Sequence, residues 1–408
     1  MIFICNIKSH SLIPVSQIAE IIMTSAVLRA HTRVTVPDPQ EALNVLSKFY
    51  VDNDCAVTFE GSDHVISVGL GTMRVGQQEN GLTIEITAAN DTAISQLKTG
   101  VITMVDQLVP GADLDCRWQG AGQGDAKSGK LPNFRELRVA SVCDLGPDMR
   151  RLRLTGDDLA PYLGGAIHVR LLVPPHGDDA PEWPTMGENG LPVWPQGDKK
   201  VEPRVYTIRQ INADEGWMDI DFVVHGDNGP GSRFANHAAP GQLLGVTGPI
   251  GNDLTNADWY LFAADETGMP AICRYLEELP AEKTGQVIFE VSGPQAKIDI
   301  PHHAGFDIGW VFRDGSAPEG TVMQSAQLVA ASSEMPNAKD DAKTDEDGIS
   351  PFANMVCDVC LPDDGRSIFC WTATEAATYR HLHKHFRKSG KLGRDECLVM
   401  TFWRAVKH

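Results

Sequence analysis

The chain has 408 residues, of which 42% are hydrophobic, so it can bury more than one core and is expected to form two or three domains. Its 35 basic residues stand against 54 acidic ones, and the net charge of −19 argues against nucleic acid as a partner. Its apolar stretches are far shorter than the roughly 20 residues of a membrane-spanning helix, and its nine irregularly spaced cysteines indicate free thiols, so we expect a cytoplasmic protein without membrane insertion.

The first domain is expected over residues 23–118, as a small α+β unit of unknown function. Met23-Thr24-Ser25 is the more ordinary domain start, which makes residues 1–22 a leader extension or the product of a misassigned start codon. Asp38 and Pro39 predict the cap and first position of a helix. Strands are expected at 56–59, 65–68, 72–75 and 82–86, a second helix at 91–108, and a Gly-rich polar linker at 120–130.

The second domain is expected over residues 131–254, where short strands alternate with Gly and Pro turns. This texture is typical of an antiparallel barrel or a sandwich. The strands are expected at 137–142, 149–155, 168–173, 204–210, 217–224 and 243–248.

The third domain is expected over residues 257–408, where strands and helices alternate and therefore predict a parallel sheet with crossover helices. An acidic low-complexity segment, 331–348, is interpreted as a surface insertion. A barrel followed by such a lobe resembles the plan of the ferredoxin-reductase-like flavoproteins. Strands are expected at 259–264, 286–291, 308–312 and 367–372, and helices at 270–279, 321–330 and 375–388.

Two neighbouring motifs carry the chemistry of the second domain. Arg204-Val205-Tyr206-Thr207 lies on an expected strand, whose alternation sends Arg204 and Tyr206 to one face. Fourteen residues beyond Thr207, the run 221–235 passes from a strand into a Gly-Pro-Gly-Ser turn that opens a short helix. Backbone N–H groups at such a turn favour a bound pyrophosphate.

With these motifs in place, the chain from about Phe134 to Arg404 resembles the siderophore-interacting protein family of FAD-dependent ferric-siderophore reductases. Each landmark alone is weak, but seven in the right order are specific. The N-terminal unit resembles a small family of unknown function that is sometimes fused to these reductases. The landmarks are the segments 168–174, 190–195, 221–235, 248–251, 265–267, 371–375 and 402–404.

The resemblance implies a set of FAD contacts. Arg204 would neutralise the FAD phosphates, Tyr206 would pack on the isoalloxazine ring, and Thr207 would hydrogen-bond near flavin N5 as a catalytic residue. The imidazole of His225 would contact the ribityl chain or the phosphates, although a structural role in the barrel is an equal alternative. The other residues implied to bind FAD are Val205, Phe222, Val224, Gly229, Gly231 and Ser232.

The resemblance also implies a nicotinamide site beside the flavin, with Thr267 as a second catalytic and cofactor-binding residue. Small residues exchange for small ones at Gly231 and Ala264, where the family has Ala and Gly. Thr374 replaces the Gly of the family's Trp-x-Ala-Gly-Glu motif, and the terminal Gly-Tyr-Trp-Arg is Thr-Phe-Trp-Arg in this chain. A β-branched residue in place of Gly keeps the backbone further from a ligand, so the case for NADH or NADPH is weaker than that for FAD.

The implied reaction passes electrons from NADH or NADPH through FAD to a ferric siderophore, followed by release of ferrous iron. The anionic chelate would dock on a basic island of Arg170, Arg313 and Arg404, unless these are surface ion-pair partners or Arg313 reads the dinucleotide. The alternatives are a reductase that works with a ferredoxin or flavodoxin partner, and a flavin-bearing siderophore-binding protein without turnover.

Two further patterns could bind metal. Cys357 and Cys360 have the spacing of zinc ligands or a dithiol, but there is no second pair nearby, so ordinary thiols are favoured. His381 and His385 share a face of an expected helix, for which a solvated basic face is the favoured interpretation. No metal site is therefore predicted.

Overall fold

The computed structural model describes residues 27–52, 55–121, 131, 134–226, 229–251, 253–302, 305–320, 350–393 and 395–404. The expectations for residues 1–22, 122–130, 321–330 and 331–348 lie outside the described residues. Packing divides the chain into two units. One unit combines the N-terminal region with Gly177–Pro203 and Gly245–Asn252, and the other contains Leu137–His176, Arg204–Leu244 and the chain from Asp253 onward.

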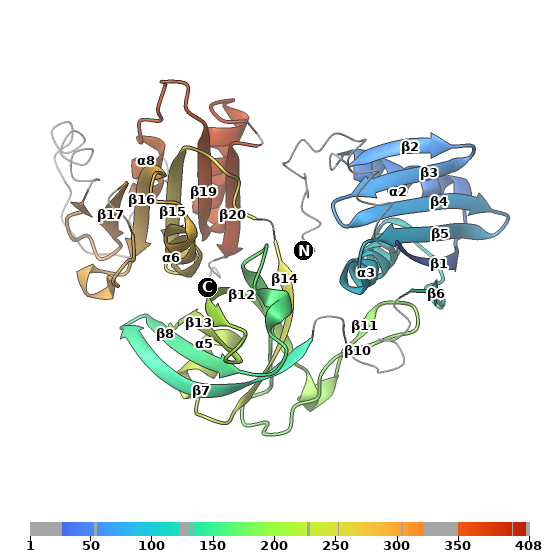
Figure 1. Cartoon of the computed structure of the whole chain (residues 1–408), viewed down its shortest axis with the longest axis horizontal. Coiled ribbons are helices and arrows are strands. Elements are labelled where there is room, and N and C mark those ends of the chain that lie inside the picture. The colour runs from blue at the N-terminus through green and yellow to red at the C-terminus, as the bar shows by residue number, and fades with distance from the viewer. Residues whose placement is uncertain are drawn as a thin grey trace. The chain divides into compact units, whose positions relative to one another are not determined.

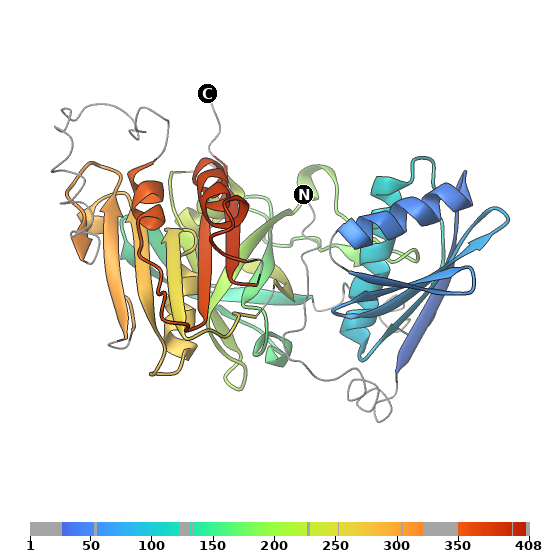
Figure 2. The same cartoon turned by 90° about the horizontal axis from the view of Figure 1, so that it is seen from above.

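The N-terminal domain is a six-stranded sheet covered by two helices (Figures 1 and 2). As predicted, Asp38 caps the first helix, because its Oδ1 accepts the Glu41 N–H at 3.0 Å. The unpredicted strand β1 places Ala30, Thr32 and Val34 in the core, and such small or polar inward residues give a weak strand signal. The elements are β1 (Leu28–Thr35), α2 (Pro39–Asp52), β2 (Ala56–Glu60), β3 (Asp63–Val68), β4 (Gly71–Gln78), β5 (Gly81–Ala88), α3 (Asp91–Leu108) and β6 (Gln119–Gly120), and the sheet order is β2-β3-β4-β5-β1-β6.

Gly120, the first residue of the expected linker, belongs instead to β6 and pairs with Ala30 of β1. Only glycine fits at position 120, because a Cβ there would lie 2.4 Å from the Arg29 carbonyl oxygen.

The second domain is a closed six-stranded barrel, which decides between the barrel and the sandwich expected from the sequence. Its core is formed by the side chains that point inward from the strands. Leu152, Leu154, Ile208 and Ile220 are among them, and all four are fully buried. Its strands are β7 (Arg135–Gly146), β8 (Met149–Thr155), β9 (His168–Val173), β12 (Glu202–Asn212), β13 (Trp217–Val223) and β14 (Leu243–Ile250), in the order β12-β13-β8-β7-β14-β9. Between β9 and β12 the chain forms a separate hairpin, β10 (Thr185–Met186) and β11 (Pro192–Val193).

The third domain contains the predicted parallel sheet, with one short antiparallel strand at its edge (Figure 1). Its central strand β15 is buried along its whole length, and it sends Tyr260 and Phe262 to one core and Leu261 and Ala263 to the other. The strands are β15 (Trp259–Asp265), β16 (Thr284–Val291), β17 (Phe306–Phe312), β18 (Glu319–Gly320), β19 (Ile368–Glu375) and β20 (Cys397–Trp403), in the order β18-β17-β16-β15-β19-β20.

The helices of this lobe differ from the expectations at two places. An unpredicted helix, α8 (Pro351–Cys357), covers the core that contains Leu261, and β20 was also not predicted. The helix expected over 375–388 is α-helical only over α9 (Ala376–His383), and its last five residues, Lys384–Lys388, are a π-helix. Helix α6 (Met269–Glu278) lies where it was expected, within one residue at each end.

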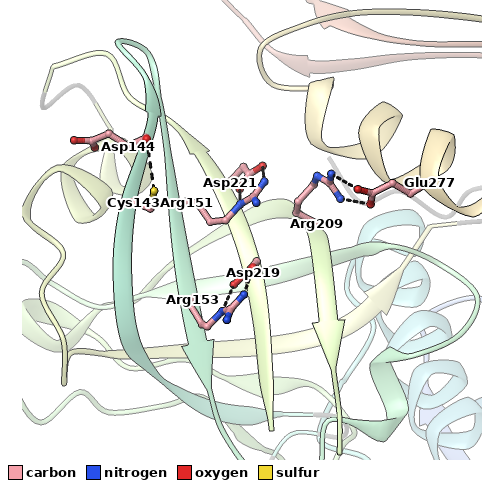
Figure 3. Close-up of polar contacts among 8 residues, drawn as sticks. All are labelled: Cys143, Asp144, Arg151, Arg153, Arg209, Asp219, Asp221 and Glu277. Atoms are coloured by element: carbon pink, nitrogen blue, oxygen red, sulfur yellow. Dashed lines mark hydrogen bonds and ion pairs between the residues drawn. The ribbon is translucent and has the colours of Figure 1, made fainter. Parts of the chain in front are cut away.

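Arginine ion pairs line the barrel and connect it to α6 (Figure 3). Arg151 and Arg153 of β8 form bidentate pairs with Asp221 and Asp219, their direct partners on β13, at 2.7–2.9 Å. Arg209 lies at a register shift in β12 and forms a bidentate pair with Glu277 of α6, at 2.5 and 2.8 Å. The first two pairs join β8 to β13, and the third joins β12, the strand that carries the Arg204 motif, to the lobe.

Candidate functional site

The Arg204 motif lies near the start of β12, on a strand as predicted, but the exposure of its residues does not alternate. Arg204 and Val205 are exposed, whereas Thr207 is only 4% exposed. Tyr206 packs on Phe222 of β13 with ring centroids 4.3 Å apart, and burial raises the pKa of its phenol, which therefore stays neutral. Phe222 is fully buried and so supports the Tyr206 ring from behind.

The Gly-Pro-Gly-Ser turn has the geometry that the sequence predicted. Gly229 has φ +94° and precedes helix α5 (Pro230–His237), whose first N–H groups have no partner within their own helix. A Cβ at Gly231 would lie 2.1 Å from the Tyr206 hydroxyl oxygen. The absence of a side chain at Gly231 therefore leaves the space that the Tyr206 hydroxyl occupies.

The side chain of Ser232 stabilises the turn itself. Its hydroxyl accepts the His225 N–H at 2.9 Å and donates to the Gly226 carbonyl at 2.7 Å. The N–H of Val224 likewise donates to the Asp148 carbonyl at 2.8 Å. Any anion at this turn is therefore expected to contact the backbone of the helix start more than the Ser232 hydroxyl.

A buried histidine that the sequence reasoning used only as a landmark lies behind Thr207. His168 Nδ1 is 3.2 Å from Thr207 Oγ1. Burial, with a smaller contribution from Arg274, lowers the pKa of His168 to about 4, so its imidazole is neutral at physiological pH. Its ring packs edge-on against Phe402 of β20, which in turn contacts Trp371 of β19. The two C-terminal landmarks thus meet the barrel at His168.

The side chain of Thr267 is bound to the neighbouring Asp265. Its N–H and its hydroxyl both donate to Asp265 Oδ1, at 2.9 and 2.5 Å, and Trp403 Nε1 donates to Oδ2 at 2.8 Å. Burial of the Asp265 carboxyl is the main cause that raises its pKa. Thr374, the residue that replaces the family's Gly, is 1% exposed, and its hydroxyl donates to the Glu375 carbonyl at 3.3 Å.

Three acidic side chains and Arg313 gather at the carboxyl ends of β15, β16 and β17. Arg313 pairs with Glu266 and lies 3.7 Å from Glu290, so its charge is shared between two carboxylates. Burial raises the pKa of Glu290 to about 7, against the opposing effect of Arg313 and with a smaller contribution from Asp265. Ligands of open parallel sheets bind at this edge.

The three arginines expected to form the basic island have different surroundings. Arg170 is exposed on β9, and Arg404 is exposed directly after β20. Arg313 is engaged by Glu266 and Glu290, which makes it a weaker candidate for an anionic chelate than the other two.

The two possible metal sites have local explanations. Cys357 ends α8, Cys360 is exposed, and both are free thiols. His385 Nε2 is 2.9 Å from the ammonium of Lys391. In the part of the chain that the structure describes, no group of three or more His, Cys, Asp or Glu side chains has the geometry of a metal site.

None of the helices among the described residues has both the length and the apolar character that crossing a bilayer requires.

Comparison with known proteins places these features in a family. A model described as the siderophore-interacting FAD-binding domain matches residues 138–253, and one described as siderophore-interacting protein matches residues 257–406. The matched residues begin at 138, so the N-terminal domain lies outside both models.

Individual relatives share this region of the chain. The ferric vibriobactin reductase ViuB of Vibrio cholerae is 29% identical over 265 residues, which is 64% of this chain and 86% of that protein. The NADPH-dependent ferric-chelate reductase of Escherichia coli is 32% identical over 199 residues, 47% of this chain and 76% of that protein. The crystal structure of the siderophore-interacting protein SipS from Aeromonas hydrophila has a TM-score of 0.50 and 26% identity, and covers 68% of this chain and 93% of that one.

Proposed function

The chain belongs to the siderophore-interacting protein family, and from this premise we propose that it is an FAD-dependent ferric-siderophore reductase that takes electrons from NADH or NADPH and releases ferrous iron. The observation that carries the proposal is the FAD-binding barrel joined to a parallel-sheet lobe, in a chain whose relatives are named ferric-chelate and ferric-siderophore reductases.

The residues around the Arg204 motif fit FAD. The exposed Arg204 supplies a cation, the turn at Gly229 supplies backbone N–H groups for a pyrophosphate, and the Tyr206 ring supplies an aromatic face. The absent Cβ at Gly231 lets the Tyr206 hydroxyl lie against the start of helix α5. When bound, FAD accepts two electrons as a hydride and passes them on singly, which suits a nicotinamide donor and a one-electron ferric acceptor.

The protein's own groups orient the cofactor without a titrating acid or base. The neutral imidazole of His168 lies 3.2 Å from the Thr207 hydroxyl, so this hydroxyl has a fixed hydrogen-bond partner on β9. Thr267, held by Asp265, would line the nicotinamide side. Thr207 is buried, whereas Thr267 is only partly buried.

We assign the docking of the anionic chelate to Arg170 and Arg404, with Arg313 as a weaker third candidate because of its two carboxylate partners. A local basic island is required because the chain's net charge of −19 repels a polyanionic chelate. The double variant Arg170→Ala with Arg404→Ala should raise the KM for the chelate while leaving FAD content unchanged.

The test of the function is steady-state oxidation of NADH and of NADPH by the purified protein with a ferric siderophore, with ferrous iron trapped by a colorimetric chelator. Reduced ferredoxin serves as the alternative donor, because a ferredoxin or flavodoxin partner is the rival proposal. Turnover with a dinucleotide supports the reductase, turnover with ferredoxin alone supports the rival, and a bound flavin without turnover supports a siderophore-binding protein.

We also place the protein in the cytoplasm. The cysteines of the described residues are all free, as expected in a reducing compartment, and NADH and NADPH are cytoplasmic donors.

A further inference from the structure

The N-terminal domain binds a hairpin that belongs, by sequence, to the barrel. This hairpin, β10–β11, carries the five-residue turn Gly187–Leu191 and lies in the segment Gly177–Pro203, which packs in the same unit as the N-terminal domain. The segment lies outside the N-terminal domain in sequence, because it connects β9 to β12.

The turn has a rigid internal structure. The Gly187 N–H donates to the Leu191 carbonyl at 2.9 Å, the Gly190 N–H donates to the Gly187 carbonyl at 3.0 Å, and the Leu191 N–H donates to Asn189 Oδ1 at 3.0 Å. Gly190 has φ +83°, a conformation that side-chain-bearing residues rarely adopt. The turn therefore presents its backbone carbonyls in one fixed arrangement.

Side chains of the N-terminal domain donate to those carbonyls. Trp118 Nε1 donates to the Asn189 carbonyl at 3.0 Å, and Thr99 Oγ1 of α3 donates to the Gly190 carbonyl at 2.8 Å. In the other direction, Asn189 Nδ2 donates to the Leu114 carbonyl at 3.1 Å.

Packing around these bonds leaves no spare room. A Cβ at Gly190 would lie 2.9 Å from Trp118 Nε1, and Leu191 packs against the apolar core of the domain. Trp118 itself is 7% exposed, and the ammonium of Lys98 lies 5.7 Å from its ring centroid. We call the set Thr99, Leu114 and Trp118 the hairpin socket.

The two chain segments on either side of the hairpin are also held by hydrogen bonds. Lys199, on the segment that returns to β12, donates to Asp178 Oδ1 at 2.8 Å and to the Ala180 carbonyl at 3.1 Å, both on the segment that follows β9. Trp183 Nε1 donates to Glu136 at 2.7 Å. The segment is thus ordered from the hairpin tip to the residues just before Arg204.

We propose that the N-terminal domain is an intramolecular docking platform whose hairpin socket holds the β10–β11 hairpin and thereby preorganises the chain that enters the Arg204–Thr207 strand for FAD. When the middle of the segment between β9 and β12 is already held, its two ends have fewer conformations to lose. The entropic cost of ordering them when FAD binds is therefore smaller. This inference rests on the flavin site of the proposed function, but it is tested by FAD binding and hairpin exchange, neither of which requires ferric reduction.

The test uses the full chain with the double variant Thr99→Val and Trp118→Phe, which removes both donors and keeps most of the side-chain volume. Hydrogen–deuterium exchange of residues 185–193 should become at least about tenfold faster, and the FAD dissociation constant, followed by flavin fluorescence, should rise about two- to tenfold. Thr99→Ser, which keeps the hydroxyl, should behave like the wild type.

A matched control and a second variant keep the test decisive. Tyr50→Phe removes another buried hydroxyl of the N-terminal domain, one that contacts Met73 and not the hairpin, and should change neither readout. Asn189→Ala acts from the hairpin side: it removes the bond to the Leu114 carbonyl and the turn's own bond from the Leu191 N–H, but keeps the carbonyls that Thr99 and Trp118 contact, so it should shift both readouts in the same direction by a smaller factor. Faster exchange with unchanged FAD affinity would overturn the positioning role, and unchanged exchange would overturn the docking itself. If the wild type binds FAD but reduces no ferric chelate, the proposed function fails while this inference is still judged by the two readouts.

Discussion

Buried carboxylates are neutralised in two different ways in the barrel and in the lobe. On the barrel, Asp219 and Asp221 each receive a bidentate arginine from the neighbouring strand (Figure 3). At the carboxyl edge of the lobe sheet, Glu266 and Glu290 share Arg313, while Asp265 relies on the neutral donors Thr267 and Trp403. In the barrel each buried carboxylate thus has its own arginine, whereas at the lobe edge two carboxylates share one, and burial raises the pKa of Glu290 to about 7.

The largest effect is expected from breaking a barrel pair. Arg151→Ala would leave Asp221, whose side chain is 1% exposed, buried without its cation, and should lower the free energy of unfolding by about 3–4 kcal/mol. Urea unfolding of the flavin-free protein measures this. Arg153→Ala leaves Asp219, whose side chain is 2% exposed, equally without its cation and should cause a similar loss. Lys48→Ala is the control, because its pair with Asp52 is exposed on both sides (74% and 57%); a loss as large as that of Arg151→Ala would contradict the dependence on burial.

Arg204 is expected to contribute to FAD binding but not to the stability of the barrel. Arg204→Ala should weaken FAD binding by about 1.5–3 kcal/mol, because one charge-assisted contact to phosphate is lost, and should leave the stability of the flavin-free protein nearly unchanged. Fluorescence titration with FAD gives the affinity, and mass analysis of the flavin released by heat identifies it. Full retention of FAD by this variant, or FMN alone in the wild type, would argue against the assignment of the phosphate site.

Glu290 should make the stability of the lobe depend on pH. Its pKa is raised from 4.5 to about 7, so the folded state holds a proton that the unfolded state has lost, and the associated stability is present below pH 4.5 and lost as the pH rises through 7. Between pH 5 and 7 the wild type should lose about 2 kcal/mol relative to Glu290→Gln. Unfolding curves of the two proteins that stay parallel over this range would show that Glu290 does not titrate there.

His168 should show the opposite sign and a smaller effect. Its pKa is lowered from 6.5 to about 4, so the unfolded state binds the proton first, and stability is lost as the pH falls from 6.5 toward 4. Between pH 7 and 5.5 the wild type should lose about 1.5 kcal/mol relative to His168→Gln. A step near pH 6.5 in the imidazole NMR signal of the folded protein would instead show an exposed, ordinary histidine.

Elements with a strong local pattern could be predicted from the sequence. The strands expected at 149–155 and 168–173 match β8 and β9, and the apolar stripe in 91–108 matches α3. The Gly229 turn and the helix after it were likewise predicted. The positive φ of Gly229 and the start of the helix depend only on residues that are close together in the sequence. The order of the landmarks was also sufficient for the family.

The partners of the functional side chains were decided by tertiary structure alone. Arg313 meets Glu266 from a position 47 residues away, Trp403 reaches Asp265 across 138 residues, and His168 meets Thr207 across 39. The sequence likewise assigned the 177–203 segment to the barrel, whereas its hairpin turn packs with the N-terminal domain. Local alternation and turn residues specify which strand or turn forms, because they act through neighbouring backbone; which charges meet and which loop is held depends on where the folded chain brings distant residues together.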